Sequence, residues 1–386
     1  MSFLARDVAV VGVGYSQVAR AGDHDIHQLT LDASRRAIRD AGLEPNDVDA
    51  IINYQFGGGD APTCATTQRL LGIENVAVYN DIMGSGPSGL AAALDATMAI
   101  ASGACETALV YRCITRAAGY AGAVRETPTA LGGPAELTIP YGFGGGLIQT
   151  MGMRKRRRVA VLGGSYEDYG HIAVTARKWA ALNERAALRS PLTMDDYMNS
   201  RPIAEPLVVL DCDYPVNGCC AAVLTTAERA RDLAQAPVVI DSMAYSTGRY
   251  SDWLYNDDFL YGGMIACGKL LWERSSLRPD DVDTAQLYDG FTHIAISWIE
   301  ALGLCGIGEF HDWVDDGRRI APGGSMPLNT SGGQLAEGRL HGLAFLCEAA
   351  LQLQGRCGAR QVPDARAALV ANAAGPQSGA MVLRTA

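Results

Sequence analysis

The chain has 386 residues, 48% of them hydrophobic and 19% charged, which is enough apolar material for about two to three domain-sized cores. Its net charge of −10 argues against nucleic acid as a partner. No apolar run reaches the roughly 18 residues that span a membrane, and the N-terminus lacks a basic, cleavable leader, so the sequence predicts a cytoplasmic protein with no membrane partner.

The first part of the chain alternates between strand and helix patterns. Val8–Val13 predicts a strand, and the GVGYS that ends it lacks the third glycine of a dinucleotide-binding loop. Ile26–Ala41 has apolar residues at helical spacing, and Val48–Tyr54 predicts a second strand. Leu90–Ser102 is rich in alanine, which suits a helix buried between two sheets.

A long segment interrupts this alternation. Residues of about 113–200 predict a loop insertion, glycine-rich at Ala117–Gly146, and loops of such length are usually functional. The basic run MRKRRR at Met153–Arg158 favours a solvated helix face, with a site for an anionic ligand as the alternative.

The second part of the chain repeats the pattern of the first. Ala41–Tyr54 reads AGLEPNDVDAIINY, and Ser275–Tyr288 reads SSLRPDDVDTAQLY, so Leu, Pro, Asp, Val, Asp and Tyr recur without a gap. A repeat of this length indicates two copies of one unit, which we divide into residues 1–236 and 237–386. The sequence therefore predicts a layered α/β fold of two similar halves.

The second copy of the repeat ends in candidate chemistry. Tyr288 and Asp289 stand where a buried strand meets a corner at Gly290. Open α/β sheets usually place their ligands at the carboxyl ends of strands, so these two side chains are the first candidates for an active site.

Three stretches resemble the thiolase superfamily, and within it the sterol-carrier-protein and lipid-transfer-protein branch. They are LYDGF at 287–291, NTSGGQLAEGRLHG at 329–342 and SRPIAEPLVVLDCDYPVNGCCAAVLTT at 200–226. The resemblance covers nearly the whole chain. It implies a five-layered αβαβα fold, a homodimer formed through the thiolase core and an acyl-CoA thioester as the ligand.

The departures from the thiolase pattern concern its reactive groups. The family's nucleophilic cysteine is replaced by Met83, which has no thiol and cannot carry an acyl group. Tyr288 and Arg339 stand at the places of two family histidines, and His341 follows two positions after Arg339. The segment Asn372–Gly375 stands where some members have a late Cys-x-Gly.

One subgroup resembles this altered pattern, namely the lipid-transfer-protein aldolases that cleave β-hydroxyacyl-CoA side chains of steroids. They also lack the cysteine, and they carry the Tyr-Asp-x-Phe-Thr found here at Tyr288–Thr292. Where they have a second tyrosine, this chain has Arg339. They work with a separate small protein that has an OB fold and a zinc ribbon. Zinc is therefore expected only in such a partner, and we expect no metal site or cofactor in this chain, whose ten cysteines include no C-x-x-C pair.

Retro-aldol cleavage assigns a role to each candidate. Tyr288 is the candidate base, Arg339 could lower its pKa or hold the enolate oxygen, and His341 is the remaining near-neutral acid. Backbone N–H groups of Ser331, Gly332 and Gly333 could form an oxyanion hole.

Each candidate also has a structural interpretation. The structural alternatives are a strand-end residue for Tyr288, a cap of the following helix for Asp289 and a partner of Glu337 or another carboxylate for Arg339. For His341 the alternative is a core histidine. Two further residues are candidates for contact with the substrate: His293, one turn into a helix, and Met83, which is expected to pack in the space of the lost cysteine.

Three functions remain in competition. The first is a lyase (retro-aldolase) for a bulky β-hydroxyacyl-CoA. The second is a catalytically silent thiolase-like subunit of a heteromeric enzyme. The third is an acyl-CoA acyltransferase with a relocated nucleophile at Cys212, Cys219 or Cys305, which lacks the positioned base that a nucleophile needs.

Overall fold

The computed structural model describes residues 4–20, 25–55, 61–83, 88–115, 147–249, 258–373 and 375–386. The elements of the first half are β1 (Val8–Tyr15), α1 (Ile26–Asp40), β2 (Ala50–Gln55), α2 (Cys64–Leu71), β3 (Val78–Met83), α3 (Ser88–Ser102), β4 (Thr107–Thr115) and β7 (Asn217–Thr226). Those of the second half are β8 (Val238–Thr247), α9 (Met264–Arg274), β9 (Thr284–Leu287), α10 (Thr292–Ala301), α13 (Leu343–Leu353), β10 (Ala367–Asn372) and β11 (Gln377–Thr385).

The two halves share one topology. In the described residues nine strands form a sheet in the order β3-β2-β4-β7-β1-β8-β11-β10-β9. In the first half β1 pairs antiparallel with β7, β7 pairs antiparallel with β4, and β4 pairs parallel with β2. In the second half β8, β11, β10 and β9 pair in the same order and directions. The halves join through a short antiparallel contact between β1 and β8. The repeat seen in the sequence is therefore a repeat of the fold.

The repeated aspartates make the same hydrogen bonds in both copies. The Asp47 carboxylate accepts from the N–H of Glu44, and its counterpart Asp281 accepts from the N–H of Arg278, both at 2.8 Å. Asp49 accepts from the first N–H groups of β4, and Asp283 accepts from those of β10 in the same way. These residues recur because each copy needs the same turn and the same strand anchor.

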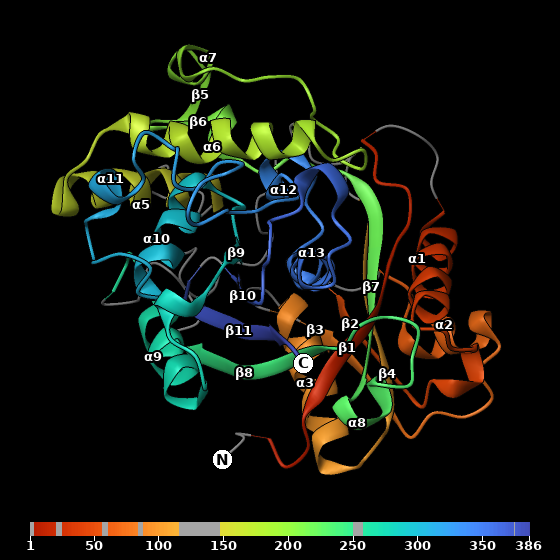
Figure 1. The fold of residues 1–386 in the computed structure, drawn as a ribbon. Coiled ribbons are helices and arrows are strands. Elements are labelled where there is room, and N and C mark those ends of the chain that lie inside the picture. The colour runs from red at the N-terminus through yellow and green to blue at the C-terminus, as the bar shows by residue number, and fades with distance from the viewer. Residues whose placement is uncertain are drawn as a thin grey trace.

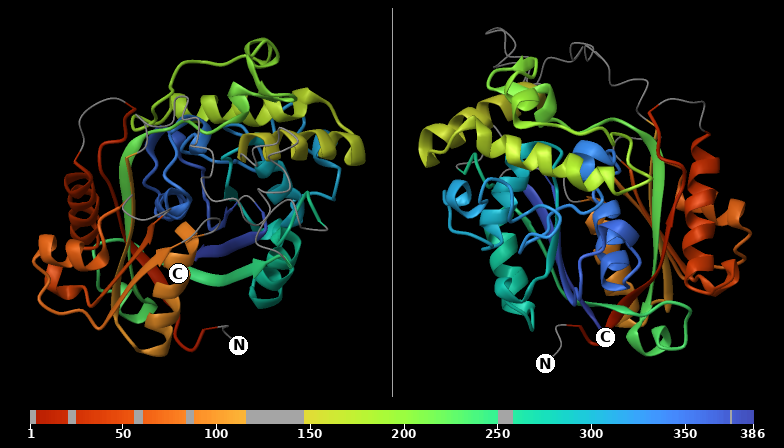
Figure 2. Two further views of the ribbon diagram at one scale, coloured as in Figure 1. Left: turned by 180° about the vertical axis from the view of Figure 1, so that it is seen from behind. Right: turned by 45° about the horizontal axis from the view of Figure 1, so that its top comes forward.

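Helices cover and separate the sheet halves (Figure 1). Helices α1 and α2 lie outside the first half, α9 and α10 lie outside the second, and α3 and α13 lie between them, in contact with strands of both (Figure 2). The layering confirms the expected αβαβα arrangement. Helix α1 packs directly on β1, because a Cβ at Gly14 would lie 2.1 Å from the carbonyl oxygen of Ala33. The glycines at the end of β1 thus serve helix packing.

The segment expected as a loop at about 113–200 holds three helices in its second part. They are α5 (Leu147–Leu162), α6 (Tyr166–Ala181) and α7 (Met194–Met198); residues 116–146 lie outside the described part. Figure 1 shows α5 and α6 crossing above the sheet, followed by the short strands β5 (Pro202–Ala204) and β6 (Leu207–Val208). The loop prediction is wrong for these three stretches, because they are helical.

Within the described ranges, no helix has both the length and the apolar character that crossing a bilayer requires.

Candidate active site

Tyr288 lies at the carboxyl end of β9, with 8% of its surface exposed. Its N–H donates to the carbonyl of Ala371 at 2.9 Å, which extends the parallel pairing with β10 by one residue. The phenol turns back over Gly290, where a Cβ would lie only 2.4 Å from the Tyr288 hydroxyl oxygen. The glycine at the corner is therefore what makes room for the phenol.

The loop that carries the NTSGG motif is fastened to this strand end. The Asn329 side chain accepts from the N–H of Leu287 at 2.7 Å and donates to its carbonyl at 2.9 Å, as a neighbouring strand would. Asp289 accepts from the N–H of Gln334 at 2.8 Å. Gln334 belongs to the short helix α12 (Gly333–Ala336), so Asp289 caps α12 and not α10, the following helix that we had expected.

Complete burial raises the pKa of Asp289 to about 7, against the opposing effect of the hydrogen bonds it accepts. One carboxylate oxygen bonds Gln334, and no hydrogen-bond partner among the described residues is recorded for the other. Asp289 is thus a poorly solvated carboxyl group directly beside Tyr288, able to hold a proton near neutral pH.

Arg339 forms a buried ion pair with Asp213. The Arg339 Nε lies 3.1 Å from an Asp213 carboxylate oxygen, and both side chains are under 10% exposed. Burial raises the pKa of Asp213, and the Arg339 charge opposes that rise. The Asp213 N–H donates to the carbonyl of Gly290 at 3.1 Å, so the pair is tied to the Tyr288 corner. Of the carboxylates considered for Arg339, the partner is Asp213 and not Glu337.

His341 lies against the strand ends of the first half. Its Nδ1 is 3.1 Å from a guanidinium nitrogen of Arg112, on β4, and its ring centroid is 5.8 Å from that of Tyr54, on β2. Arg112 is fully buried, donates to the carbonyl of Tyr54 at 2.9 Å and covers the Tyr54 ring at 4.6 Å. His341 is buried as well, as a core histidine would be. It differs from a histidine in an apolar core because its ring contacts the charged side chain of Arg112.

The strand ends of both halves meet around residues 341 and 342. The pairing of Ala371 with Leu287 puts Asn372 beside Tyr288, and a Cβ at Gly342 would lie within 2.4 Å of the Asn372 side chain. Sequence reasoning did not propose Arg112, Asp213 or Asn372 as site residues. Asn372 had a signal, because it opens the segment that replaces the late Cys-x-Gly, and Asp213 lies in the stretch 200–226 that carries the resemblance. Arg112 follows only from strand register.

The N–H groups proposed as an oxyanion hole are already engaged within their turn. The Gly332 N–H donates to the carbonyl of Asn329 at 2.8 Å, and the Gly333 N–H donates to Ser331 Oγ at 3.3 Å. The prediction of an oxyanion hole at these two groups is therefore wrong for this conformation. The Ser331 carbonyl in turn accepts from Asn183, which anchors the loop to the end of α6.

His293 is fully buried, and neither ring nitrogen has a hydrogen-bond partner in the described part of the chain. Burial lowers its pKa well below the ordinary value, and the charges of Arg154, Lys155 and Arg158 on α5 lower it further. The histidine is thus neutral and lies near α5, and no described contact joins it to Tyr288.

Met83 does not fill a core position. It ends β3, the edge strand of the first half, and 57% of its surface is exposed in the single chain. The expectation that it packs in place of the lost cysteine is wrong for the chain by itself.

Three of the six residues of the basic run are buried and bonded inside the protein, so the expected solvated face is wrong for them. Lys155 bonds Asp211 at 2.7 Å, and Arg158 pairs with Glu300 through both of its terminal nitrogens. Arg154 donates to the carbonyl of Leu260. The contacts of Arg154 and Arg158 join α5 to the second half, and carboxylates neutralise Lys155 and Arg158 without an anionic ligand.

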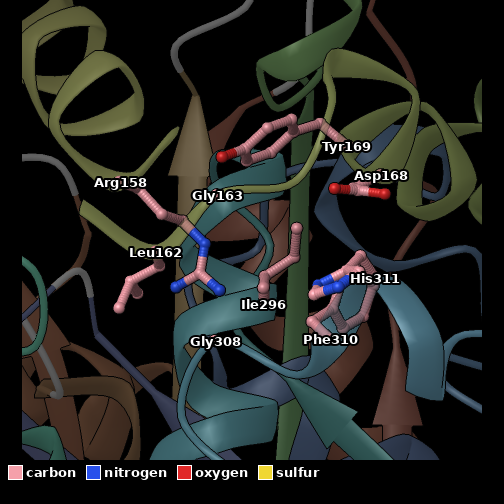
Figure 3. A pocket seen from close by; sticks show the side chains of 9 residues that line it. All are labelled: Arg158, Leu162, Gly163, Asp168, Tyr169, Ile296, Gly308, Phe310 and His311. Carbon is pink, nitrogen blue, oxygen red and sulfur yellow. The ribbon is translucent and has the colours of Figure 1, made fainter. Parts of the chain in front are cut away.

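A pocket adjoins this helix (Figure 3). It lies among α5, α6, α10 and α11 (Phe310–Trp313), and none of the catalytic candidates lines it. Its guanidinium, Arg158, is already paired with Glu300. The pocket therefore differs in place and in chemistry from the Tyr288 corner. Elsewhere, no group of three or more His, Cys, Asp or Glu suited to a metal is found in the described ranges.

The cysteines named for a relocated nucleophile are held as thiols. Burial is the first cause that raises the pKa of Cys212 and of Cys219, and it raises that of Cys305 to about 12. A thiolate is the reacting form of cysteine, so these environments oppose acyl capture.

Comparisons with known proteins show what this chain is similar to. Residues 250–384 match the family described as "Thiolase C-terminal domain-like". A 17-hydroxy-3-oxo-4-pregnene-20-carboxyl-CoA lyase of Mycobacterium tuberculosis is 36% identical over 362 residues, covering 91% of this chain and 92% of its own. A steroid side-chain-cleaving aldolase of Thermomonospora curvata is 32% identical over 393 residues, covering 99% of each chain.

Solved structures give the same picture. One described as "Ltp2-ChsH2(DUF35) aldolase" has a TM-score of 0.90 at 32% identity and covers 100% of this chain and 99% of that one. Human mitochondrial 3-ketoacyl-CoA thiolase has a TM-score of 0.71 at 15% identity, with 99% of each chain covered, which shows a shared fold alone.

Proposed function

Because this chain belongs to the thiolase superfamily, in the lipid-transfer-protein branch with the steroid side-chain-cleaving aldolases, we propose that it is a carbon–carbon lyase acting on an acyl-CoA. The substrate is a bulky β-hydroxyacyl-CoA, such as a steroid that carries its acyl-CoA as a side chain. The observation that carries the proposal is the Tyr288 phenol at a strand end, at a corner where the Gly290 carbonyl accepts from Asp213, the ion-pair partner of Arg339, in a chain with Met83 at the place of the cysteine.

The reaction is a retro-aldol cleavage. Tyr288 accepts the proton of the β-hydroxyl as the bond between the α and β carbons breaks. The hydroxyl carbon becomes a ketone carbonyl, and the electron pair of the broken bond moves into the thioester as an enolate. The enolate carbon then takes up a proton, balanced by the one that Tyr288 accepted and gives back, which leaves a shorter acyl-CoA and restores the phenol. No covalent acyl-enzyme is formed, so the loss of the cysteine is compatible with the chemistry.

Arg339 is the candidate cation for this step. A tyrosine with an ordinary pKa of about 10 needs a positive neighbour to act as a base near neutral pH. Arg339 is held at the Tyr288 corner through Asp213, which offsets part of its charge. A guanidinium is a poor proton donor, so its role is to stabilise the phenolate or the enolate oxygen.

The assembly we propose is a homodimer bound to a small partner. The edge strand β3 presents Tyr79 and Met83, 65% and 57% exposed, with only β2 beside it among the described strands. Native proteins rarely leave an apolar edge strand uncovered, which supports a second copy of the chain at this edge. The similar structure that includes a DUF35 protein supports a partner of that type, with the expected OB fold and zinc ribbon.

The test is Tyr288→Phe, with Tyr54→Phe as the matched variant at the equivalent position of the first half. Each protein is purified with its DUF35-type partner, and the released ketone and acyl-CoA are measured by mass spectrometry. We expect Tyr288→Phe to lower kcat by about 10²- to 10⁴-fold. Tyr54→Phe should lose at least about tenfold less, because its ring stays beneath Arg112.

Full cleavage by Tyr288→Phe would end the proposal. A wild-type complex that binds the thioester but releases no product would favour the silent subunit. An acylated cysteine in a trapped intermediate would favour the acyltransferase, which the raised thiol pKa values oppose.

A further inference from the structure

Asp211 is a fully buried carboxylate that accepts hydrogen bonds from α5, α7, α10 and its own turn, counting the described residues. One oxygen accepts from the Lys155 ammonium at 2.7 Å and from the N–H of Val208 at 2.8 Å. The other oxygen accepts from the Tyr197 hydroxyl at 2.6 Å and from the Thr292 hydroxyl. A carboxylate has about four acceptor sites, so these donors fix both of its oxygens.

The charge of this carboxylate is balanced inside the protein. Lys155 supplies the positive charge, and the Lys155 and Asp211 side chains are only 1% and 0% exposed. Burial and the Asp211 charge raise the pKa of Tyr197, so its phenol stays a donor to the carboxylate. Moving Asp211 away from its donors would leave a buried charge without partners, which is costly. The carboxylate is therefore a firm attachment point for whatever bonds to it.

The residues that follow Asp211 run alongside the corner of the candidate site. Cys212 forms an antiparallel bridge with Phe291, and the Asp213 N–H donates to the carbonyl of Gly290 at 3.1 Å. Together with the bond from the next hydroxyl of the corner to Asp211, these contacts fasten the corner at three consecutive residues. The segment that begins with the carboxylate thus holds the corner residue by residue.

The place of the Tyr288 phenol depends on this fastening. The ring turns back over Gly290, where a Cβ would lie 2.4 Å from the hydroxyl oxygen. The N–H of Tyr288 donates to the carbonyl of Ala371 on β10, which fixes the strand side of the corner. The other side is fixed by the bond between Thr292 and Asp211. A shift of Thr292 would therefore displace Gly290 beneath the phenol.

We propose that Asp211 is a positioning residue, which fixes the Tyr288 corner through the Thr292 hydroxyl and ties it to helices α5 and α7. The proposal rests on the lyase function proposed above and concerns the same site. In this role Asp211 acts through the corner and takes no part in proton transfer. The proposal also gives a task to the threonine of the Tyr-Asp-x-Phe-Thr motif, to which the retro-aldol chemistry assigns none.

Two matched variants each remove one donor from the same Asp211 oxygen. Thr292→Val removes the hydroxyl of the corner with little change of shape, and Tyr197→Phe removes the hydroxyl of α7. The Tyr197 hydroxyl also accepts from Lys155 at 3.1 Å, so its loss should lower the midpoint of urea unfolding at least as much. We expect Thr292→Val to lower kcat by about tenfold with a smaller change in KM, and Tyr197→Phe to lower it by less than about twofold.

Rescue and a double variant separate positioning from a general loss of stability. Thr292→Ser keeps the donor and should recover most of kcat. In a Tyr288→Phe background, Thr292→Val should lower the residual cleavage by less than about twofold, because its effect acts through the phenol. A full kcat in Thr292→Val, equal losses in Thr292→Val and Tyr197→Phe, or an undiminished loss in the Tyr288→Phe background would each refute the positioning role.

Hydrogen exchange tests the fastening of the corner without any activity. The amide of Asp213, which donates to Gly290, should exchange faster in Thr292→Val than in Tyr197→Phe. If this difference is found but the wild-type complex cleaves no thioester, the lyase function fails while the fastening of the corner stands. If the two variants exchange alike at Asp213, the positioning role is refuted whatever the activity of the complex.

Discussion

The two halves end their parallel strand pairs at equivalent places with different side chains. In the first half Tyr54 and Arg112 follow the last parallel-paired residues of β2 and β4. In the second half Tyr288 and Asn372 follow those of β9 and β10. Both pairs approach the turn at His341 and Gly342. The Arg112 guanidinium contacts the His341 ring, and the Asn372 amide lies against Gly342.

The difference shows what duplication preserved. The aspartates that anchor the strands make the same hydrogen bonds in both copies, so the scaffold is shared. The first tyrosine lies under a cation inside the protein, whereas the second turns over a glycine beside an ion pair. Chemistry is thus proposed for the half whose corner leaves space for the phenol.

The largest effect should come from closing that space. Gly290→Ala leaves Tyr288 in the chain, but its Cβ would lie 2.4 Å from the phenol oxygen, so the ring must move. We expect about a 10²-fold loss of kcat/KM, since small misplacements of reacting groups have costs of that size. In a Tyr288→Phe background the same change should add no further loss. Undiminished activity of Gly290→Ala would mean that the phenol position does not matter.

The ion pair at this corner should matter next, through stability. Arg339→Met leaves the Asp213 carboxylate buried without its charge partner, which we expect to lower the free energy of unfolding by about 3–5 kcal/mol. Urea denaturation measures the change. The double variant Arg339→Met with Asp213→Leu should recover most of it, because no unpaired charge remains. Equal losses in the single and double variants would show that packing, and not charge, is at stake.

The residue that follows each tyrosine should make the stability of the protein depend on pH in the second half and not in the first. The first half has the neutral Gln55 where the second has Asp289, whose pKa is raised to about 7. Between about pH 4 and this value the folded chain holds a proton that the unfolded chain has lost, so stability falls as pH rises. Asp289→Asn should remove a decline on the order of 2 kcal/mol between about pH 5 and about pH 7, measured by urea unfolding. Parallel profiles of the two proteins would contradict the raised pKa.

The smallest effects should be equal in the two halves. Asp49→Ala and Asp283→Ala each remove an acceptor from the first N–H groups of a strand. Each change should lower the free energy of unfolding by about 1–2 kcal/mol without affecting kcat, as losses of similar capping bonds do. A difference of more than about 1 kcal/mol between them would show that the copies have diverged in their scaffold as well.

Several features could be predicted from the sequence because they depend on local pattern. The repeat of Leu, Pro, Asp, Val, Asp and Tyr indicated two similar halves, and the alanines of α3 indicated a helix between sheets. Prediction failed where burial depends on distant partners. Lys155 and Arg158 of the basic run are buried because Asp211 and Glu300, far away in the sequence, neutralise them.

The sequence by itself determined the alternation of strands and helices, the duplication and the placing of Tyr288 at a strand end, since periodicity and turn residues act over a few positions. Only the tertiary structure decided that Arg339 pairs with Asp213 and that Arg112 contacts His341. Those outcomes follow from strand register and burial, which bring together charges and donors that lie tens to hundreds of residues apart along the chain.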